Sequence, residues 1–167
     1  EGLMKLLGNH ISDSEDFVRS AVAETVGVFG SKPDAVPLID KLLIQLSAEK
    51  VPTCQQAILN TLGQVQHIPA LEQCISMWQG SKDQDVSAAA IAAAGKISSR
   101  LEPADAVRIE LLVQSIEQNI GKTKNMPLLR VALFRAIRRI VENDNWGSIA
   151  AGPLSTLIAD GLKDTEA

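Results

Sequence analysis

The stretch VRSAVAETVG, residues 18–27, decides the fold, because the chain repeats its pattern three more times. The repeats are CQQAILNTLG at 54–63, VSAAAIAAAG at 86–95 and LRVALFRAIR at 129–138. Each has alanine at its fourth position and an apolar residue five places later; glycine ends the first three and Arg138 the last. Apolar residues three, four and eight apart form one stripe along an α-helix, so each stretch predicts an amphipathic helix.

A second set of helical patterns lies between these stretches, at approximately 34–48, 69–80, 103–120 and 153–162. All seven prolines fall between the expected helices or in a first turn, where a missing N–H and a fixed φ do least harm. The glycines are interpreted as punctuation at helix ends. The chain is therefore expected to form four helix pairs, each a helix A followed by a helix B. Their approximate bounds are 13–48, 51–80, 83–120 and 126–163.

A short apolar segment, GLMKLLG at residues 2–8, precedes the first pair. It has the pattern of the last turns of another B helix whose A helix is missing. Two interpretations stay open, an excised piece of a longer array and a helical N-terminal cap. We expect residues 1–167 to form a single repeat domain with a partial helix at its start.

Small residues on the A helices suit close packing between neighbouring pairs. A helix pair cannot bury its apolar face alone, whereas stacked pairs shield each other. The shared alanines are expected at the helix crossings: Ala21, Ala57, Ala89 and Ala132. The pattern thus predicts an all-α fold in which about four helical hairpins stack in a row.

The segment EDFVRSAVAETVG, residues 15–27, resembles the first helix of a bacterial-type HEAT repeat of the phycobilisome-lyase-like kind. Such repeats open with an acidic residue, continue with Val-Arg and small residues, and end in a Leu-Gly-like pair. The motif arginine is present at Arg19 and Arg130, whereas Gln55 and Ser87 replace it in the middle repeats. The resemblance implies an armadillo-like, right-handed α-α superhelix that binds other proteins.

Composition excludes several classes of function. Aromatic residues make up 3% of the chain and tyrosine is absent, which disfavours the stacking platforms that bind single-stranded nucleic acid. The net charge of −4 is opposite to that of a general polyanion binder, so a nucleic-acid partner is unlikely on composition. No run approaches the ~20 apolar residues of a membrane span. Two cysteines form no secreted disulfide framework, so we expect a reducing, cytoplasmic location.

No pattern in the sequence indicates catalysis, a metal or a cofactor. His10 and His67 have no second ligand at metal-binding spacing. Cys54 and Cys74 lie on apolar stripes, where a thiol behaves as a small hydrophobic group. There is no glycine-rich phosphate loop. Trp146 is expected in a loop that folds back on the core. The chain is therefore interpreted as non-enzymatic.

One segment concentrates positive charge, because no acid occurs between Glu117 and Glu142. At 100° per residue, its three last arginines share one side of the fourth A helix and the apolar residues take the other. The segment has two interpretations, a solvated helix face and an anion site for an acidic peptide or a phosphate backbone. Its basic residues are Lys122, Lys124, Arg130, Arg135, Arg138 and Arg139.

The B helices carry the candidate partner-binding residues. The resemblance to HEAT arrays implies that B helices line the concave side, where apolar groups among polar ones suit a protein or peptide partner. We predict a scaffold or adaptor; the alternatives are a bilin-lyase-like activity and anion binding through the basic helix. The residues expected to contact the partner are Lys41, Ile44, Gln45, Gln73, Met77, Arg108, Leu111 and Gln114.

Overall fold

The computed structural model describes residues 2–30, 32–146, 152, 154, 155 and 159. These residues are helical and contain no strand, which confirms the all-α prediction. None of the helices among them is both long and apolar enough to cross a membrane. The α-helices are α1 (Gly2–His10), α2 (Asp16–Phe29), α3 (Val36–Ala48), α4 (Pro52–Gln64), α5 (Leu71–Gly80), α6 (Gln84–Ser98), α7 (Ala106–Asn119) and α8 (Pro127–Val141).

The expected alternation of A and B helices is present. The four repeated stretches lie in α2, α4, α6 and α8, and the B patterns of the first three pairs lie in α3, α5 and α7. A short 3-10 turn precedes each of these B helices: η1 (Pro33–Ala35), η2 (Ile68–Ala70) and η3 (Pro103–Asp105). Proline suits these turns because its φ is already near the helical value. The B helix expected at 153–162 lies largely outside the described residues.

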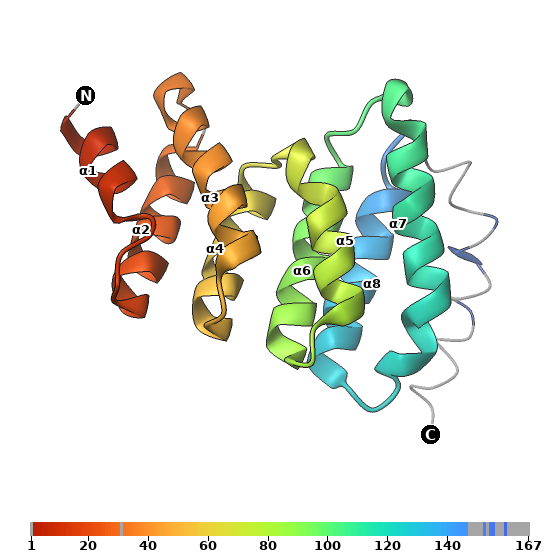
Figure 1. The fold of residues 1–167 in the computed structure, drawn as a ribbon. Coiled ribbons are helices and arrows are strands. Elements are labelled where there is room, and N and C mark those ends of the chain that lie inside the picture. Colours follow the sequence, from red (N-terminus) through yellow and green to blue (C-terminus); the bar gives the residue numbers. More distant parts are fainter. Residues whose placement is uncertain (1, 31, 147–151, 153, 156–158, 160–167) are drawn as a thin grey trace.

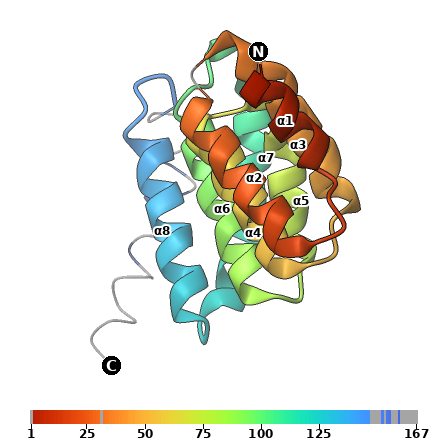
Figure 2. The same cartoon turned by 90° about the vertical axis from the view of Figure 1, so that its left-hand side faces the viewer.

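The helices form two layers, which Figure 2 shows in a view along the row. One layer, the A layer, holds α2, α4, α6 and α8, and the other, the B layer, holds α1, α3, α5 and α7. Successive pairs follow one another in a row (Figure 1), with contacts from α2 to α4, from α4 to α6 and from α6 to α8. The core runs along the whole row between the layers. Its largest fully buried side chains include Leu42, Leu59, Leu62, Leu71, Ile91, Ile109, Leu112 and Trp146.

Glycines bring the A helices together. A Cβ at Gly95 would lie 2.6 Å from the Cα of Ala136 on α8, and one at Gly63 would lie 2.8 Å from the Cα of Ala93 on α6. Both glycines lie within helices, so the interpretation as punctuation is wrong for them, whereas Gly80 is the last residue of α5, as expected. They allow backbones to touch where any side chain would hold them apart. The shared alanines mark the crossing less well than predicted, since Ala21 is exposed.

The fourth A helix differs at this position for a visible reason. Arg138 takes the place of glycine in α8, where it is exposed and pairs with Glu142 through an Nε–Oε1 contact of 2.7 Å. No A helix of the described part of the chain packs there. The residue that breaks the repeat pattern therefore stands where close backbone approach is not required.

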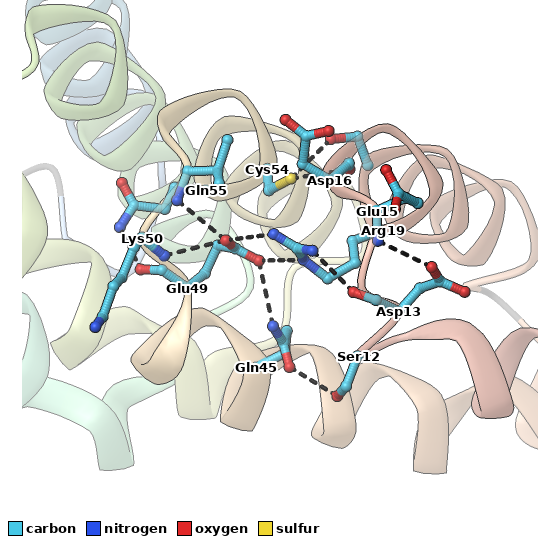
Figure 3. A network of polar contacts seen from close by, with 12 residues as sticks. Ser12, Asp13, Glu15, Asp16, Arg19, Gln45, Glu49, Lys50, Cys54 and Gln55 are labelled. Carbon is cyan, nitrogen blue, oxygen red and sulfur yellow. Dashed lines mark hydrogen bonds and ion pairs between the residues drawn. The ribbon is translucent and has the colours of Figure 1, made fainter.

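A buried ion pair joins the first two repeats (Figure 3). Arg19 on α2 donates to both carboxylate oxygens of Glu49, from Nε at 2.7 Å and from Nη2 at 2.9 Å. Glu49 follows α3 and is 7% exposed. It also accepts hydrogen bonds from the backbone N–H groups of Lys50 and Val51 and from the side chain of Gln45. Its charge is therefore fully paired although it is buried.

The motif position that holds Arg19 has the same role in two more repeats. Arg19 donates to the carbonyl of Asp13, six residues earlier, at 2.8 Å. Gln55 donates to the carbonyl of Glu49 at 2.8 Å, and Ser87 donates to that of Ser81 at 3.4 Å. Each contact closes the loop between a B helix and the next A helix. The replacements of arginine in the middle repeats thus keep a donor in place.

The A-layer crossing predicts that Gly95→Ala destabilises the protein by about 1–3 kcal/mol, as overpacking does. This would happen although alanine favours a helix over glycine by about 1 kcal/mol. Urea unfolding followed by circular dichroism measures the effect. Gly80→Ala is the matched control, because nothing lies within 4 Å of its added Cβ. Equal stability of the Gly95 variant and the wild type would contradict the close approach.

The ion pair predicts an acid-sensitive step in stability. Hydrogen bonding to Arg19, chiefly, lowers the pKa of Glu49 from 4.5 to about 2, while burial opposes the shift. The folded state binds this proton more weakly than the unfolded chain, so the stabilisation is complete above about pH 4.5 and is lost as the pH falls toward 2. Glu49→Gln should lower the free energy of unfolding by about 3–5 kcal/mol at pH 7, because it leaves Arg19 unpaired.

Urea unfolding at several pH values between 2 and 7 tests this second prediction. The Glu49→Gln variant should lose part of the pH dependence below about pH 4.5. Glu110→Gln, on the exposed side of α7, serves as the control and should keep it. If the free energy of unfolding of the Glu49→Gln variant falls as steeply with decreasing pH as that of the wild type, the ion pair does not determine the loss of stability in acid.

Candidate functional site

The B layer is joined by side chains rather than by backbone contact. Trp78 Nε1 on α5 donates to the Ser115 hydroxyl on α7 at 2.7 Å, and Gln73 on α5 donates to the Ser47 hydroxyl on α3 at 3.0 Å. Neighbouring B helices therefore lie farther apart than neighbouring A helices. The concave shape expected of this face stays a prediction. Its wide spacing leaves room for a ligand between helices.

Four of the eight candidate residues on the B layer are exposed. They are Lys41 and Ile44 on α3, and Leu111 and Gln114 on α7. Ile44 is 71% exposed and Leu111 is 45% exposed, and they are two of several large apolar side chains that reach the surface of this protein. These two side chains are the apolar part of the candidate face.

The other four candidates are half-buried and already engaged. Gln45 belongs to the ion-pair network, where it accepts from Ser12 at 2.8 Å and donates to the buried carboxylate. Gln73 bonds a serine of α3, and Met77 packs against the core. Arg108 pairs with Asp105 at 2.6 Å. Their first role is to hold B helices and turns in place.

A groove between α5 and α7 brings together two of the predicted residues, Leu111 and Gln114. It encloses about 330 Å³. Positions three, four and seven apart on each helix supply its walls, a pattern that the sequence contains but that single residues do not reveal. The further lining residues are Glu72, Ile75, Ser76, Gln79, Ser115 and Gln118.

Amide and hydroxyl side chains line most of this groove, together with one leucine. Ser115, 2% exposed at its base, accepts from Trp78 and also from Gln79 Nε2 at 3.0 Å. Its one carboxylate, on Glu72, lies 3.9 Å from Arg108. Amide side chains both donate and accept hydrogen bonds, so they match the alternating groups of a peptide backbone. The lining holds no nucleophile beside a general base.

The basic residues around α8 do not form one cluster. Arg135, Arg138 and Arg139 are exposed opposite a buried apolar stripe, which confirms the predicted division of the helix. Lys122 and Lys124 lie at its other end, roughly 18 Å away at 1.5 Å per residue. This arrangement separates the six cations into two groups.

Several of the same cations have partners. Arg138 pairs with Glu142, and Lys122 Nζ donates to Asn119 Oδ1 at 2.7 Å. The Arg130 guanidinium lies 5.8 Å from the centre of the Phe134 ring. Glu142 and Asp144 line the same hollow as Arg139. A solvated helix face therefore describes α8 better than a single anion site.

The cysteines have the role predicted for them. Both are fully buried, and burial raises the pKa of the Cys74 thiol to about 12, so this thiol stays protonated near neutral pH. Cys54 donates to the Asp16 carbonyl at 3.0 Å.

The indole of Trp146 is 1% exposed and its Nε1 donates to the Leu101 carbonyl at 3.3 Å, which confirms a loop folded back on the core.

The two histidines lie in separate turns. His10 Nδ1 is 2.8 Å from Asp13 Oδ2. His67 Nε2 is buried without a hydrogen-bond partner, although Asp40 Oδ1 lies 3.3 Å away. Within the described residues, no group of three His, Cys, Asp or Glu side chains is arranged to hold a metal ion.

Searches of protein-family models, of curated proteins and of solved structures found no match to this chain.

The groove base yields a further prediction. Ser115→Ala removes the acceptor of the buried Trp78 N–H, so we expect a loss of about 1–3 kcal/mol in the free energy of unfolding. Ser76→Ala, on the exposed wall of the same groove, should change it by less than about 0.5 kcal/mol. Chemical denaturation measures both values. Equal effects would mean that the indole N–H finds another acceptor.

Proposed function

We propose that this chain is a non-enzymatic scaffold or adaptor that binds an extended segment of a partner protein on its B-helix face. The observation that carries the proposal is the groove between α5 and α7, with amide side chains on both walls and exposed Leu111 inside it. A peptide strand needs such donors and acceptors for its backbone and an apolar contact for one side chain.

The proposal includes a HEAT-like architecture, that is, a right-handed superhelix of stacked hairpins. The two layers and the A-to-A stacking support it (Figures 1 and 2). The repeated hydrogen bond from the motif position to a carbonyl six residues earlier supports it further. In such an array each added pair extends the same face, so a partner can contact several repeats at once.

Magnitudes suggest that recognition is spread over the face. Burying one leucine contributes about 1.5–3 kcal/mol, and each hydrogen bond adds about 0.5–1.5 kcal/mol net. One groove of this size therefore supports weak binding only. Ile44 on α3 is a second exposed apolar residue of the same layer, in which α5 lies between α3 and α7 (Figure 1).

Two other functions have less support. A bilin-lyase-like activity rests on the resemblance of residues 15–27 alone. Nucleic-acid binding through α8 is weakened by the two separate groups of cations and by the pairing of Arg138 with Glu142. Neither function uses the groove between α5 and α7.

The experiment replaces the two exposed aliphatic residues of the B face. Ile44→Glu combined with Leu111→Glu should reduce recovery of the main partner from native lysate at least tenfold, because a buried carboxylate opposes binding. Phe17→Glu combined with Leu128→Glu is the matched control on A helices, since these residues are 67% and 70% exposed. Circular dichroism should show equal helix content in all three proteins. Full recovery by the B-face variant would exclude this face.

A further inference from the structure

The turns from A helices to B helices line one edge of the row, the upper edge of Figure 1. They hold a hollow of about 930 Å³ that runs from the end of α2, past the end of α4, to the turn after α6. Neither the proposed B-face site nor the basic helix includes this edge. We call it the turn-edge hollow.

Two cations flank the turn-edge hollow. Lys32 lies in the turn after α2, where its Nζ is 5.0 Å from the centre of the Phe29 ring, and Arg100 lies in the turn after α6. Neither forms an ion pair with a carboxylate of the described residues. No acid lines the hollow, although the chain as a whole carries a net charge of −4. The lining of the hollow thus carries positive charge at both ends.

Between the two cations the lining combines apolar side chains with the polar groups of Gln64, Gln66 and His67. Val28 is 72% exposed and Val36 is 49% exposed, and Val65 and Ile68 form the middle of the floor. Exposed β-branched side chains gathered in one hollow favour a ligand with apolar groups of its own. The hollow therefore pairs an apolar centre with a positive charge at each end.

The wall around the second turn is fixed by an unusual backbone conformation. Gln66 has a φ of 53°, in the left-handed region that non-glycine residues seldom adopt. Its Nε2 donates to the Lys96 carbonyl at 3.1 Å and to the Ser99 hydroxyl at 2.8 Å. These bonds hold the second turn against the end of α6. The wall is therefore shaped before any ligand arrives, which lowers the entropy cost of binding.

The acids near the two cations lie outside the lining, although Asp34 is two residues from Lys32 and Glu102 is two residues from Arg100. His67 Nε2 faces Asp40 on α3, whose side chain lies outside the lining. The Glu102 side chain accepts a backbone hydrogen bond in the η3 capping box. Partial negative charge at the helix C-termini stabilises Lys32 and Arg100 without neutralising them.

From this geometry we infer that the turn-edge hollow binds an extended acidic–apolar peptide segment, with one carboxylate at Lys32, another at Arg100 and aliphatic side chains between them. Neighbouring helix axes lie roughly 8–10 Å apart, so the two cations are separated by roughly 16–20 Å. An extended peptide covers roughly 3.3 Å per residue. The two acidic residues of the ligand should therefore stand about five or six positions apart. This inference is independent of the B-face proposal.

The test uses an amide-capped, fluorescent hexapeptide with glutamate at both ends and valine or leucine between them. Fluorescence anisotropy at low salt should show saturable binding to the full chain, weaker at 0.5 M salt because exposed charges are screened. Lys32→Glu with Arg100→Glu should weaken binding at least tenfold. Val28→Ser should weaken it severalfold, since that side chain is exposed and its loss leaves the fold intact.

Four comparisons make the result decisive. Lys5→Glu with Arg135→Glu changes the net charge equally at other exposed positions and should leave binding within twofold of the wild type. A peptide with lysine at both ends should not bind, and one with a single glutamate should bind at least fivefold more weakly. Equal binding of any of these peptides, or equal loss in the control variant, would overturn the inference. Ile44→Glu with Leu111→Glu should bind the peptide normally, so failure of one site is separable from failure of the other.

Discussion

The row of helices depends on backbone contact in the A layer. Gly63 and Gly95 let α4, α6 and α8 approach until Cα atoms of one helix touch the bare face of the next. Glycine inside a helix costs about 1 kcal/mol relative to alanine, so the chain accepts this loss for closer packing. The gain is dispersion contact between many backbone atoms along the crossing. The alanine-rich helix α6 packs against α4, α5 and α8. It therefore contacts both neighbouring A helices as well as the B helix of the repeat before it.

Tight packing in one layer determines what the other layer can do. The A helices are joined by backbone, whereas the groove and the turn-edge hollow lie between B helices and along the turns. The B helices meet through Trp78, Ser115 and glutamine side chains, whose hydrogen bonds span a wider gap. Side-chain bridges of this kind leave polar groups near a surface that a peptide can reach. The same stacking constraint therefore accounts for both the rigid layer and the open one.

The periodicity of the sequence was sufficient to predict the helices, because an amphipathic stripe is a local signal. The segment expected at 103–120 differs from α7 mainly by the 3-10 turn η3 at its start. The role of the glycines could not be predicted in the same way, since glycine marks both helix ends and close crossings, and only the neighbouring helix distinguishes them. Glu49 was missed because its partner Arg19 lies 30 residues away and no local pattern links the two. On the candidate face, the exposure of Leu111 follows from its position off the apolar stripe, whereas the hydrogen bonds of Gln45 could not be predicted because their partners Ser12 and Glu49 lie outside α3.

The junctions between repeats use one geometry with different chemistry. Arg19, Gln55 and Ser87 each donate to the carbonyl six residues earlier, so what the position requires is a donor of suitable reach rather than one residue type. Of these three, only Arg19 donates both to a loop carbonyl and to a buried carboxylate, so its contacts are the ones whose strength depends on charge. In a row where each repeat contacts only its neighbours, stability is a sum of local terms. Acid therefore weakens the contact between α2 and Glu49 in the loop after α3, while the hydrogen bonds of Gln55 and Ser87 to carbonyls contribute no comparable pH dependence. The side chain that closes each loop therefore differs from repeat to repeat, although the backbone packing between the A helices repeats.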